Sequence, residues 1–193
     1  MRKRCYPVML LLAMFSSILI SCKKEESVPF EEERSTQLAG TYDFVGMSVD
    51  AVQTLTTKMD DDILKAVMIT HYDTKNNTGT TVIAGSTIQN NNYGYRMEAT
   101  SEVKYYLNGN VVDEGTVTSS DTVPVSSNLL QYRLKGADSI YTTAGVPPVT
   151  QGGRYYWKGD TLIIAQRILM DVGDDTDRSV SDINTLTKLK KRK

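Results

Sequence analysis

The sequence predicts an all-β domain, an antiparallel up-and-down meander that forms a barrel or a strongly twisted sheet. Between residues 93 and 107 the odd positions are mainly aromatic or aliphatic and most even positions are polar, which is typical of a strand with one buried face. Turn signals rich in Gly and Asn separate further runs of β-branched residues. The alternating run would extend roughly 50 Å if it were straight, so the strand has to coil or bend, as strands of a barrel do.

An export signal is expected at the N-terminus. Three basic residues at 2–4 precede an apolar run over 8–20, which is too short to cross a bilayer as a helix. The sequence Leu-Ile-Ser-Cys at 19–22 resembles the lipobox of bacterial lipoproteins, in which signal peptidase II cleaves before the cysteine. The resemblance implies a lipoprotein signal peptide over 1–21 and lipidation of Cys22, which would attach the mature chain to a membrane.

A charged tether is expected to follow the lipidated cysteine. Residues 22–37 carry many Lys and Glu residues and few apolar ones, which predicts an extended segment. The sequence Lys-Lys-Glu-Glu at 23–26 resembles the surface-export signal of Bacteroidetes lipoproteins. The resemblance implies an outer-membrane lipoprotein exposed on the cell surface, and a periplasm-facing lipoprotein with an ordinary charged linker is the alternative.

Charge and cysteine usage exclude several classes of site. Removal of the three positive charges at 2–4 changes the formal net charge from −1 to −4. The body lacks the basic, aromatic-interleaved patch that binds nucleic acid, so no nucleic-acid partner is expected. Cys5 lies in the signal and Cys22 is consumed by lipid, which leaves no thiol for a disulfide, a zinc site or a catalytic nucleophile. Stability therefore has to come from a hydrophobic core.

The first strand is expected over 40–49. Residues 51–65 follow it, and their apolar side chains keep a helical spacing, which predicts a short helix or an irregular loop. The sequence Asn-Asn-Thr-Gly at 76–79 then predicts a hairpin between strands over 67–74 and 80–88.

The Asn-Gly pair at 108–109 is the strongest hairpin signal in the chain, because both residues tolerate positive φ. It connects the long alternating strand with a return strand over 110–118. Two registers are open at this point: a two-residue turn sets Lys104 opposite Asp113, and a three-residue turn aligns Val111 and Val117 with the buried face.

Turn residues continue to separate short strands towards the C-terminus, at Gly136, over 146–153 and at Lys-Gly-Asp 158–160. The strands between these turns are expected over 132–134, 139–142, 154–157 and 161–168.

The last segment, 171–193, differs from the body because it is polar and ends in a basic cluster. Its apolar residues at 180, 183, 186 and 189 keep a helix-like spacing, so a flexible or helical tail is expected. The predicted β domain accordingly covers 38–170.

Two stretches resemble lipocalin-like domains. The sequence Leu-Ala-Gly-Thr-Tyr at 38–42 is similar to the start of the lipocalin barrel, where a tryptophan occupies the place of Tyr42. The sequence Tyr-Tyr-Trp-Lys-Gly-Asp-Thr-Leu at 155–162 is similar to a late strand pair in lipocalin-like lipoproteins of the Bacteroidetes. The resemblance implies a lipocalin-like barrel over 38–170 in which Arg167 packs across Tyr42.

Catalytic and metal sites have little support in the sequence. His71 is the only histidine, and it is expected to be a partly exposed structural residue of a strand. The acidic run from Asp171 departs from a calcium loop, with Gly173 at the third position and Thr176 where the turn glycine belongs. We therefore expect no catalytic residue, no metal and no cofactor, and no enzymatic activity.

Three tripeptides, Asp-Thr-Val at 121–123, Asp-Ser-Ile at 138–140 and Asp-Thr-Leu at 160–162, resemble the O-glycosylation sequon of the Bacteroidetes. The Asp-Thr pair at 160–161 is also explained as turn chemistry. The resemblance implies modification of Thr122 and Ser139.

Binding is the expected function, and two kinds of site compete. In the first, a lipid-anchored cell-envelope protein holds a small apolar ligand in the mouth of a barrel. Its expected lining is Tyr93, Tyr95, Met97 and Tyr105. In the second, a surface module binds a glycan or a protein on outward aromatic residues such as Tyr106 or Tyr156. An open interior favours the first, and a filled interior with an exposed aromatic row favours the second. An enzyme is the distant alternative.

Overall fold

The computed structural model describes residues 38–145 and 149–193, which form eight antiparallel strands. Each strand pairs with the next along the chain, and the last pairs with the first to close a ring. The all-β, up-and-down prediction is therefore confirmed. Within the described ranges, no helix is long and apolar enough to cross a membrane. The strands are β1 Gly40–Met59, β2 Asp62–Ala84, β3 Thr87–Leu107, β4 Asn110–Lys135, β5 Ser139–Ala144, β6 Val149–Lys158, β7 Thr161–Gly173 and β8 Asp177–Lys191.

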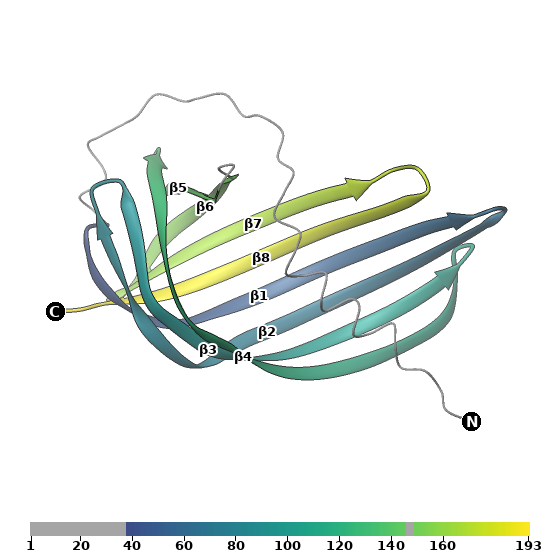
Figure 1. Ribbon diagram of the computed structural model, residues 1–193, viewed down its shortest axis with the longest axis horizontal. Helices are drawn as coiled ribbons and strands as arrows, with labels where there is room; N and C mark the ends of the chain where they lie inside the picture. The colour runs from purple at the N-terminus through teal and green to yellow at the C-terminus, as the bar shows by residue number, and fades with distance from the viewer. Residues whose placement is uncertain (1–37, 146–148) are drawn as a thin grey trace.

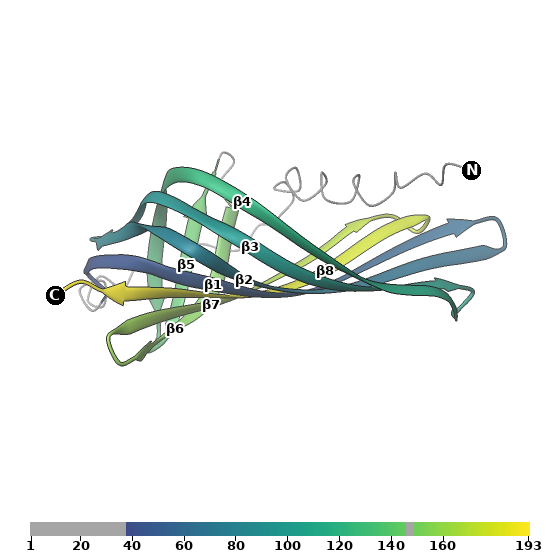
Figure 2. The same cartoon turned by 90° about the horizontal axis from the view of Figure 1, so that it is seen from below.

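The ring is complete only along part of its length, because the strands are very unequal. β5 has 6 residues and β6 has 10, whereas β1 to β4 have 20 to 26. Beyond the reach of β5 and β6, the other six strands continue together as a long curved sheet, seen at the right of Figures 1 and 2. We call this part the open sheet. Its residues are 167–173 of β7, 177–184 of β8, 50–59 of β1, 62–71 of β2, 100–107 of β3 and 110–118 of β4.

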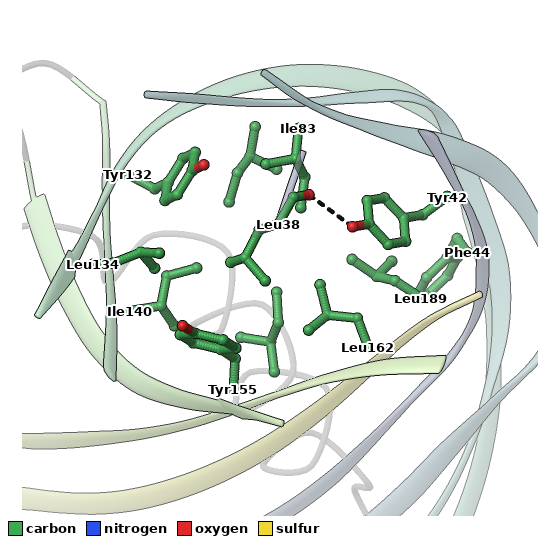
Figure 3. Close-up of a cluster of buried hydrophobic side chains, with 12 residues drawn as sticks. Leu38, Tyr42, Phe44, Ile83, Tyr132, Leu134, Ile140, Tyr155, Leu162 and Leu189 are labelled. Carbon is green, nitrogen blue, oxygen red and sulfur yellow. Dashed lines mark hydrogen bonds between the residues drawn. The ribbon is translucent and has the colours of Figure 1, made fainter. Parts of the chain in front are cut away.

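The hydrophobic core fills the closed end of the ring (Figure 3). Tyr42 is fully buried, and its hydroxyl donates a hydrogen bond of 2.7 Å to the carbonyl oxygen of Leu38. This bond gives the carbonyl of the fully buried Leu38 a hydrogen-bond partner. The buried residues of the core are Leu38, Tyr42, Phe44, Ile83, Ile88, Tyr132, Leu134, Ile140, Tyr155, Leu162, Ile164 and Leu189.

The strands alternate between an inner and an outer face, and in the open sheet the inner face is concave. Along β1, Val49 and Leu55 face inward, whereas Asp50 and Val52 are exposed on the outer, convex face. The predicted alternation of β3 is confirmed, since its odd positions from 95 to 105 are half-buried while neighbouring Arg96 and Lys104 are exposed. β3 also bends as expected, because its register shifts near Tyr93.

The expected helix or loop over 51–65 is wrong. Residues up to Met59 continue β1, Asp60 and Asp61 form the turn, and β2 begins at Asp62. Asp60 takes a positive φ of 52° there, as a tight turn requires. The helical spacing was misleading because this part of β1 pairs on both sides, with β2 and β8, and carries apolar residues on both faces.

The expected flexible or helical tail over 171–193 is also wrong. Residues 161–173 form β7 and residues 177–191 form β8, which pairs with β7 and β1 and so closes the ring. Ile183 and Leu189 point inward, whereas Val180 and Leu186 are exposed on the outer face. The four residues therefore lie on two opposite faces of one strand, and their helix-like spacing does not reflect a helix. The basic cluster is part of the barrel, since Lys190 pairs with Asp160 at 3.6 Å.

The predicted hairpin at 76–79 is wrong as well. These residues form a bulge inside β2, where the register against β3 shifts on both sides of Thr78. Asn76 and Gly79 take positive φ values of 51° and 106°. The turn-like sequence therefore forms a bulge within one strand and does not connect two strands. The actual turn lies at Gly85 and Ser86.

The Asn-Gly turn at 108–109 is confirmed with two residues, since Leu107 pairs with Asn110. A bulge at Val112 then shifts the register by one, so Lys104 faces Glu114, with their charged atoms 3.5 Å apart. Val117 consequently pairs with Ser101 on the inner face. Val111 instead pairs with Tyr106 on the outer face, because it precedes the bulge. The turn therefore has two residues, and of the two valines only Val117 faces inward.

The predictions for Arg167 and for the loop that ends at residue 153 are also wrong. Arg167 does not pack across Tyr42, because it lies on the outer face and binds Asp182 through two hydrogen bonds of 2.8 and 2.6 Å. The ring beside Tyr42 is that of Trp157, at 6.2 Å between centroids, with the Lys191 ammonium 5.8 Å from the Trp157 ring centre. The expected loop over 146–153 is strand from Val149 onward, and residues 146–148 lie outside the described ranges.

Candidate functional site

A cavity of about 500 Å³ lies inside the barrel next to the hydrophobic core. Ile88, Ile164 and Leu189 belong to both the core and the cavity wall, so the cavity has an apolar base. The wall includes residues from six strands, β3 to β8, which places the cavity where the ring is closed. Its lining residues are Ile88, Asn90, Tyr93, Leu130, Thr142, Ala144, Gly145, Val149, Gln151, Ile164, Gln166, Thr187 and Leu189.

The polar groups of the cavity are amides and hydroxyls, and the lining contains no charged side chain. Two of the amides are held by neighbouring strands: the Gln166 side chain donates to the Thr142 hydroxyl at 3.3 Å, and the Asn90 amide donates to the Asn128 side chain at 2.8 Å. Such groups can orient an uncharged ligand by hydrogen bonds while the apolar base supplies contact area.

Tyr93 is the aromatic residue of the cavity lining, and both its ring and its hydroxyl are held in place. Its ring stacks on Phe44 at 4.4 Å between centroids, and its hydroxyl hydrogen-bonds the hydroxyl of Thr81. Burial raises the pKa of the Tyr93 phenol to about 12, so the group is neutral at physiological pH. Tyr93 therefore offers the cavity a fixed, uncharged edge.

The four residues predicted to line a ligand site are brought to the inner face of β3, but they do not form one site. Tyr93 lines the cavity, and Tyr95 packs against the core with its ring 5.9 Å from that of Phe44. Met97 and Tyr105 lie farther along the concave side. The opposite wall, which includes Thr142, Gln151 and Gln166, was not predictable from the sequence, because nothing local to these residues marks them as cavity-lining.

The concave face of the open sheet continues from the barrel interior. Most of its side chains on β1, β2, β3 and β8 are half-buried, whereas those on the outermost strand β4, such as Val117, are exposed. One polar atom here has no partner among the described residues: Gln53 Oε1 is buried and unbonded, whereas its Nε2 lies 3.5 Å from the Ser179 hydroxyl. The larger apolar members of this face are Leu55, Leu64, Met68, Val103, Tyr105, Ile168, Met170 and Ile183.

The only histidine lies on the other side of the sheet. His71 Nδ1 is 2.7 Å from Asp50 Oδ1, and its Nε2 is 3.4 Å from Asp73 Oδ2, on the exposed convex face. The hydrogen bond with Asp50 is the main cause that raises the pKa of His71. Among the residues that the structure describes, no group of three or more His, Cys, Asp and Glu side chains could hold a metal ion.

The remaining predicted residues lie on the outside of the molecule or at its turns. Thr122 is exposed on β4, whereas Ser139 is half-buried at the start of β5, with its hydroxyl 3.4 Å from Asp138 Oδ1. Tyr156 is exposed, and Tyr106 packs under the Lys65 ammonium at 5.7 Å from the ring centre. These two tyrosines lie on separate strands, β6 and β3. Cys22 lies outside the described ranges.

No protein-family model matches the chain, and no curated protein does either. Among solved structures, the chain is similar to Ail, the attachment invasion locus protein of Yersinia pestis. That structure is 10% identical in sequence, covers 79% of this chain and 99% of its own, and has a TM-score of 0.20. A second structure of Ail, in complex with the heparin analogue sucrose octasulfate, is 9% identical over the same shares of both chains, with a TM-score of 0.20.

Proposed function

We propose that the protein is a lipid-anchored binding protein of the bacterial cell envelope that holds a small, uncharged and mainly apolar molecule inside its barrel. The observation that carries the proposal is the cavity of about 500 Å³, a volume within the range of small-molecule sites. Its base is aliphatic and its polar groups are neutral amides and hydroxyls. A charged ligand would lose its hydration in the cavity without meeting an opposite charge there.

The same lining supports binding without catalysis. General acid–base chemistry needs a group with a pKa near the working pH. Tyr93, with a pKa of about 12, is the one titratable side chain of the cavity wall. His71 and its carboxylate partners lie on the convex face and do not belong to the cavity wall.

A fluorescent apolar probe tests the site directly. N-phenyl-1-naphthylamine is uncharged, and its emission rises when it leaves water for an apolar cavity. We expect binding to the purified protein and its loss in Thr187→Phe, because the added ring would fill the cavity. Leu186→Phe is the matched control, since its side chain lies next in sequence but on the exposed outer face. Equal binding by both variants would contradict the proposed site, and native mass spectrometry of protein from its source would reveal the natural ligand.

We further propose that lipid on Cys22 anchors the chain to the outer membrane, with the barrel in water on the cell surface. The outer face supports this arrangement, because charged side chains stand among its exposed apolar ones: ion pairs join Arg167 to Asp182 and Arg178 to Asp171 beside Leu169 and Val180. A barrel that faces lipid instead carries an apolar band. In a Bacteroidetes host, Cys22→Ser should move the protein from the membrane fraction to the soluble fraction. Protease added to intact cells should digest the wild-type protein, and full protection would indicate the periplasmic side.

A further inference from the structure

Among the described residues, one long strand of the barrel has a neighbour on one side only over most of its length. β4 pairs with β5 through residues 131–135, so within the described ranges residues 110–130 have β3 as their single strand partner. In Figure 1, β4 is the outermost strand of the open sheet, where its residues 110–118 lie. A free edge presents a row of backbone N–H and C=O groups that another strand can use. The other free edge, residues 167–173 of β7, is much shorter and carries two ion-paired side chains, Arg167 and Asp171.

Two local hydrogen bonds identify which backbone groups of β4 face the free side. The Glu114 N–H donates to Asp113 Oδ1 at 2.9 Å, and the Thr122 N–H donates to Asp121 Oδ1 at 2.7 Å. These N–H groups therefore turn away from β3. The pairing of β4 with β3 runs without a shift from residue 113 to 123, so the even positions between them turn the same way. Those positions are Thr116, Thr118 and Ser120.

The two aspartates define a stretch of edge about one short strand long. Asp113 and Asp121 are eight positions apart, roughly 27 Å along a strand. Between them, Thr116, Thr118 and Ser120 each offer one donor and one acceptor. Val111, Val112, Val117 and Val125 are exposed along the same strand, which provides apolar contact for the side chains of an added strand.

Charge distinguishes between partners. Residues 110–130 contain Asp113, Glu114 and Asp121 and no Lys or Arg. A second copy of this chain would bring the same acidic edge against itself, and like charges across paired strands destabilise the pairing. A segment with Lys or Arg near each aspartate would instead attract the carboxylates.

We propose that the edge of β4 binds an extended, positively charged segment of a partner protein as an additional strand, paired with Thr116, Thr118 and Ser120 and held at its ends by Asp113 and Asp121. This mode is strand addition, in which the backbone supplies affinity and the side chains supply selectivity. The site is separate from the cavity, so loss of one leaves the other intact.

A nine-residue peptide, Lys-Thr-Val-Thr-Val-Thr-Val-Thr-Lys, places lysines at the spacing of the two aspartates and serves as the probe. We expect it to bind the purified protein and to slow hydrogen exchange at the amides of Thr116, Thr118 and Ser120, as measured by NMR. Replacement of both lysines by glutamate should weaken binding about tenfold or more, since two exposed ion pairs become repulsive. A peptide with the same side chains and a methylated backbone should not bind, because it cannot pair with the edge.

Substitutions in β4 test the same edge by changing the protein and not the peptide. Thr118→Pro removes an N–H group that points away from β3 and makes no hydrogen bond with that strand. Edge strands tolerate proline at such positions. Thr118→Pro should abolish peptide binding and keep probe binding in the cavity, whereas Thr118→Ala should keep both. Equal affinity for the lysine and glutamate peptides, binding of the methylated peptide, or no binding of any peptide would overturn the proposal. A dimeric mass in sedimentation with these amides already protected would assign the edge to a second copy and overturn it too.

Discussion

The strongest test of the architecture compares two leucines of β8 that the spacing along the chain cannot tell apart. Leu186 and Leu189 are three positions apart, a spacing that would place both on one face of a helix. In the barrel, Leu189 is 2% exposed inside the core, whereas Leu186 is 37% exposed on the outer face. Truncation to alanine should therefore have very different consequences at the two positions.

The expected magnitudes follow from these environments. Leu189→Ala leaves a cavity among Phe44, Leu162 and their neighbours, and such changes cost about 2 to 5 kcal/mol. Leu186→Ala removes a partly hydrated side chain and should cost less than about 1 kcal/mol. For a domain of this size, a loss of about 3 kcal/mol lowers the melting temperature by roughly 6 to 12 °C.

Urea unfolding followed by circular dichroism measures both variants under the same conditions. We expect a large fall in the midpoint for Leu189→Ala, a small one for Leu186→Ala, and equal denaturant slopes, which would show that both variants unfold from the same compact state. Equal destabilisation by the two changes would refute the placement of β8 as a strand with one inner and one outer face.

Three further predictions concern other parts of the barrel. Tyr42→Phe removes the donor to the Leu38 carbonyl and should cost about 1 to 3 kcal/mol in urea unfolding, whereas Tyr156→Phe on the exposed outer face should be nearly neutral. Gly79→Ala would place a Cβ 2.6 Å from the Asn92 carbonyl oxygen at a φ of 106°, so it should destabilise far more than Gly109→Ala, where φ is 84° but no atom lies within 4 Å. Burial raises the pKa of both Tyr72 and Tyr93 to about 12, so the folded state retains protons that the unfolded state releases near pH 10. The stabilisation should be complete below pH 10 and be lost as the pH rises towards 12, and an absorbance titration at 295 nm in which all tyrosines ionise near pH 10 would contradict it.

Local sequence signals predicted the parts of the fold that depend on neighbours along the chain. The alternation over 93–107, the Asn-Gly turn at 108–109 and the turn at 158–160 are all present, because each is set by side-chain period or by φ preferences of a few residues. The segments 51–65 and 171–193 were mistaken because their strands carry apolar residues on both faces. In a strand of that kind, apolar residues from the two faces can fall three or four positions apart, which is the spacing of an amphipathic helix.

The candidate site was predictable only where a local pattern assigns a residue to the inner face of a strand. Tyr93 was identified because the alternation of β3 assigns it to the inner face, and the cavity lies beside that face. Thr142, Gln151 and Gln166 carry no local mark of a cavity. Their common location depends on how β5, β6 and β7 pair across the ring.

Strand identity and the face of each side chain follow largely from the order of residues, because the period of two is a property of the extended backbone. The closed ring, the cavity and the free edge of β4 do not. They arise because β8 returns to β1 while β5 and β6 are too short to follow the other six strands along their whole length. Pairing between residues as distant as Asp43 and Lys190 decides these features, and only the tertiary structure records which strands meet and where one strand ends before its neighbour.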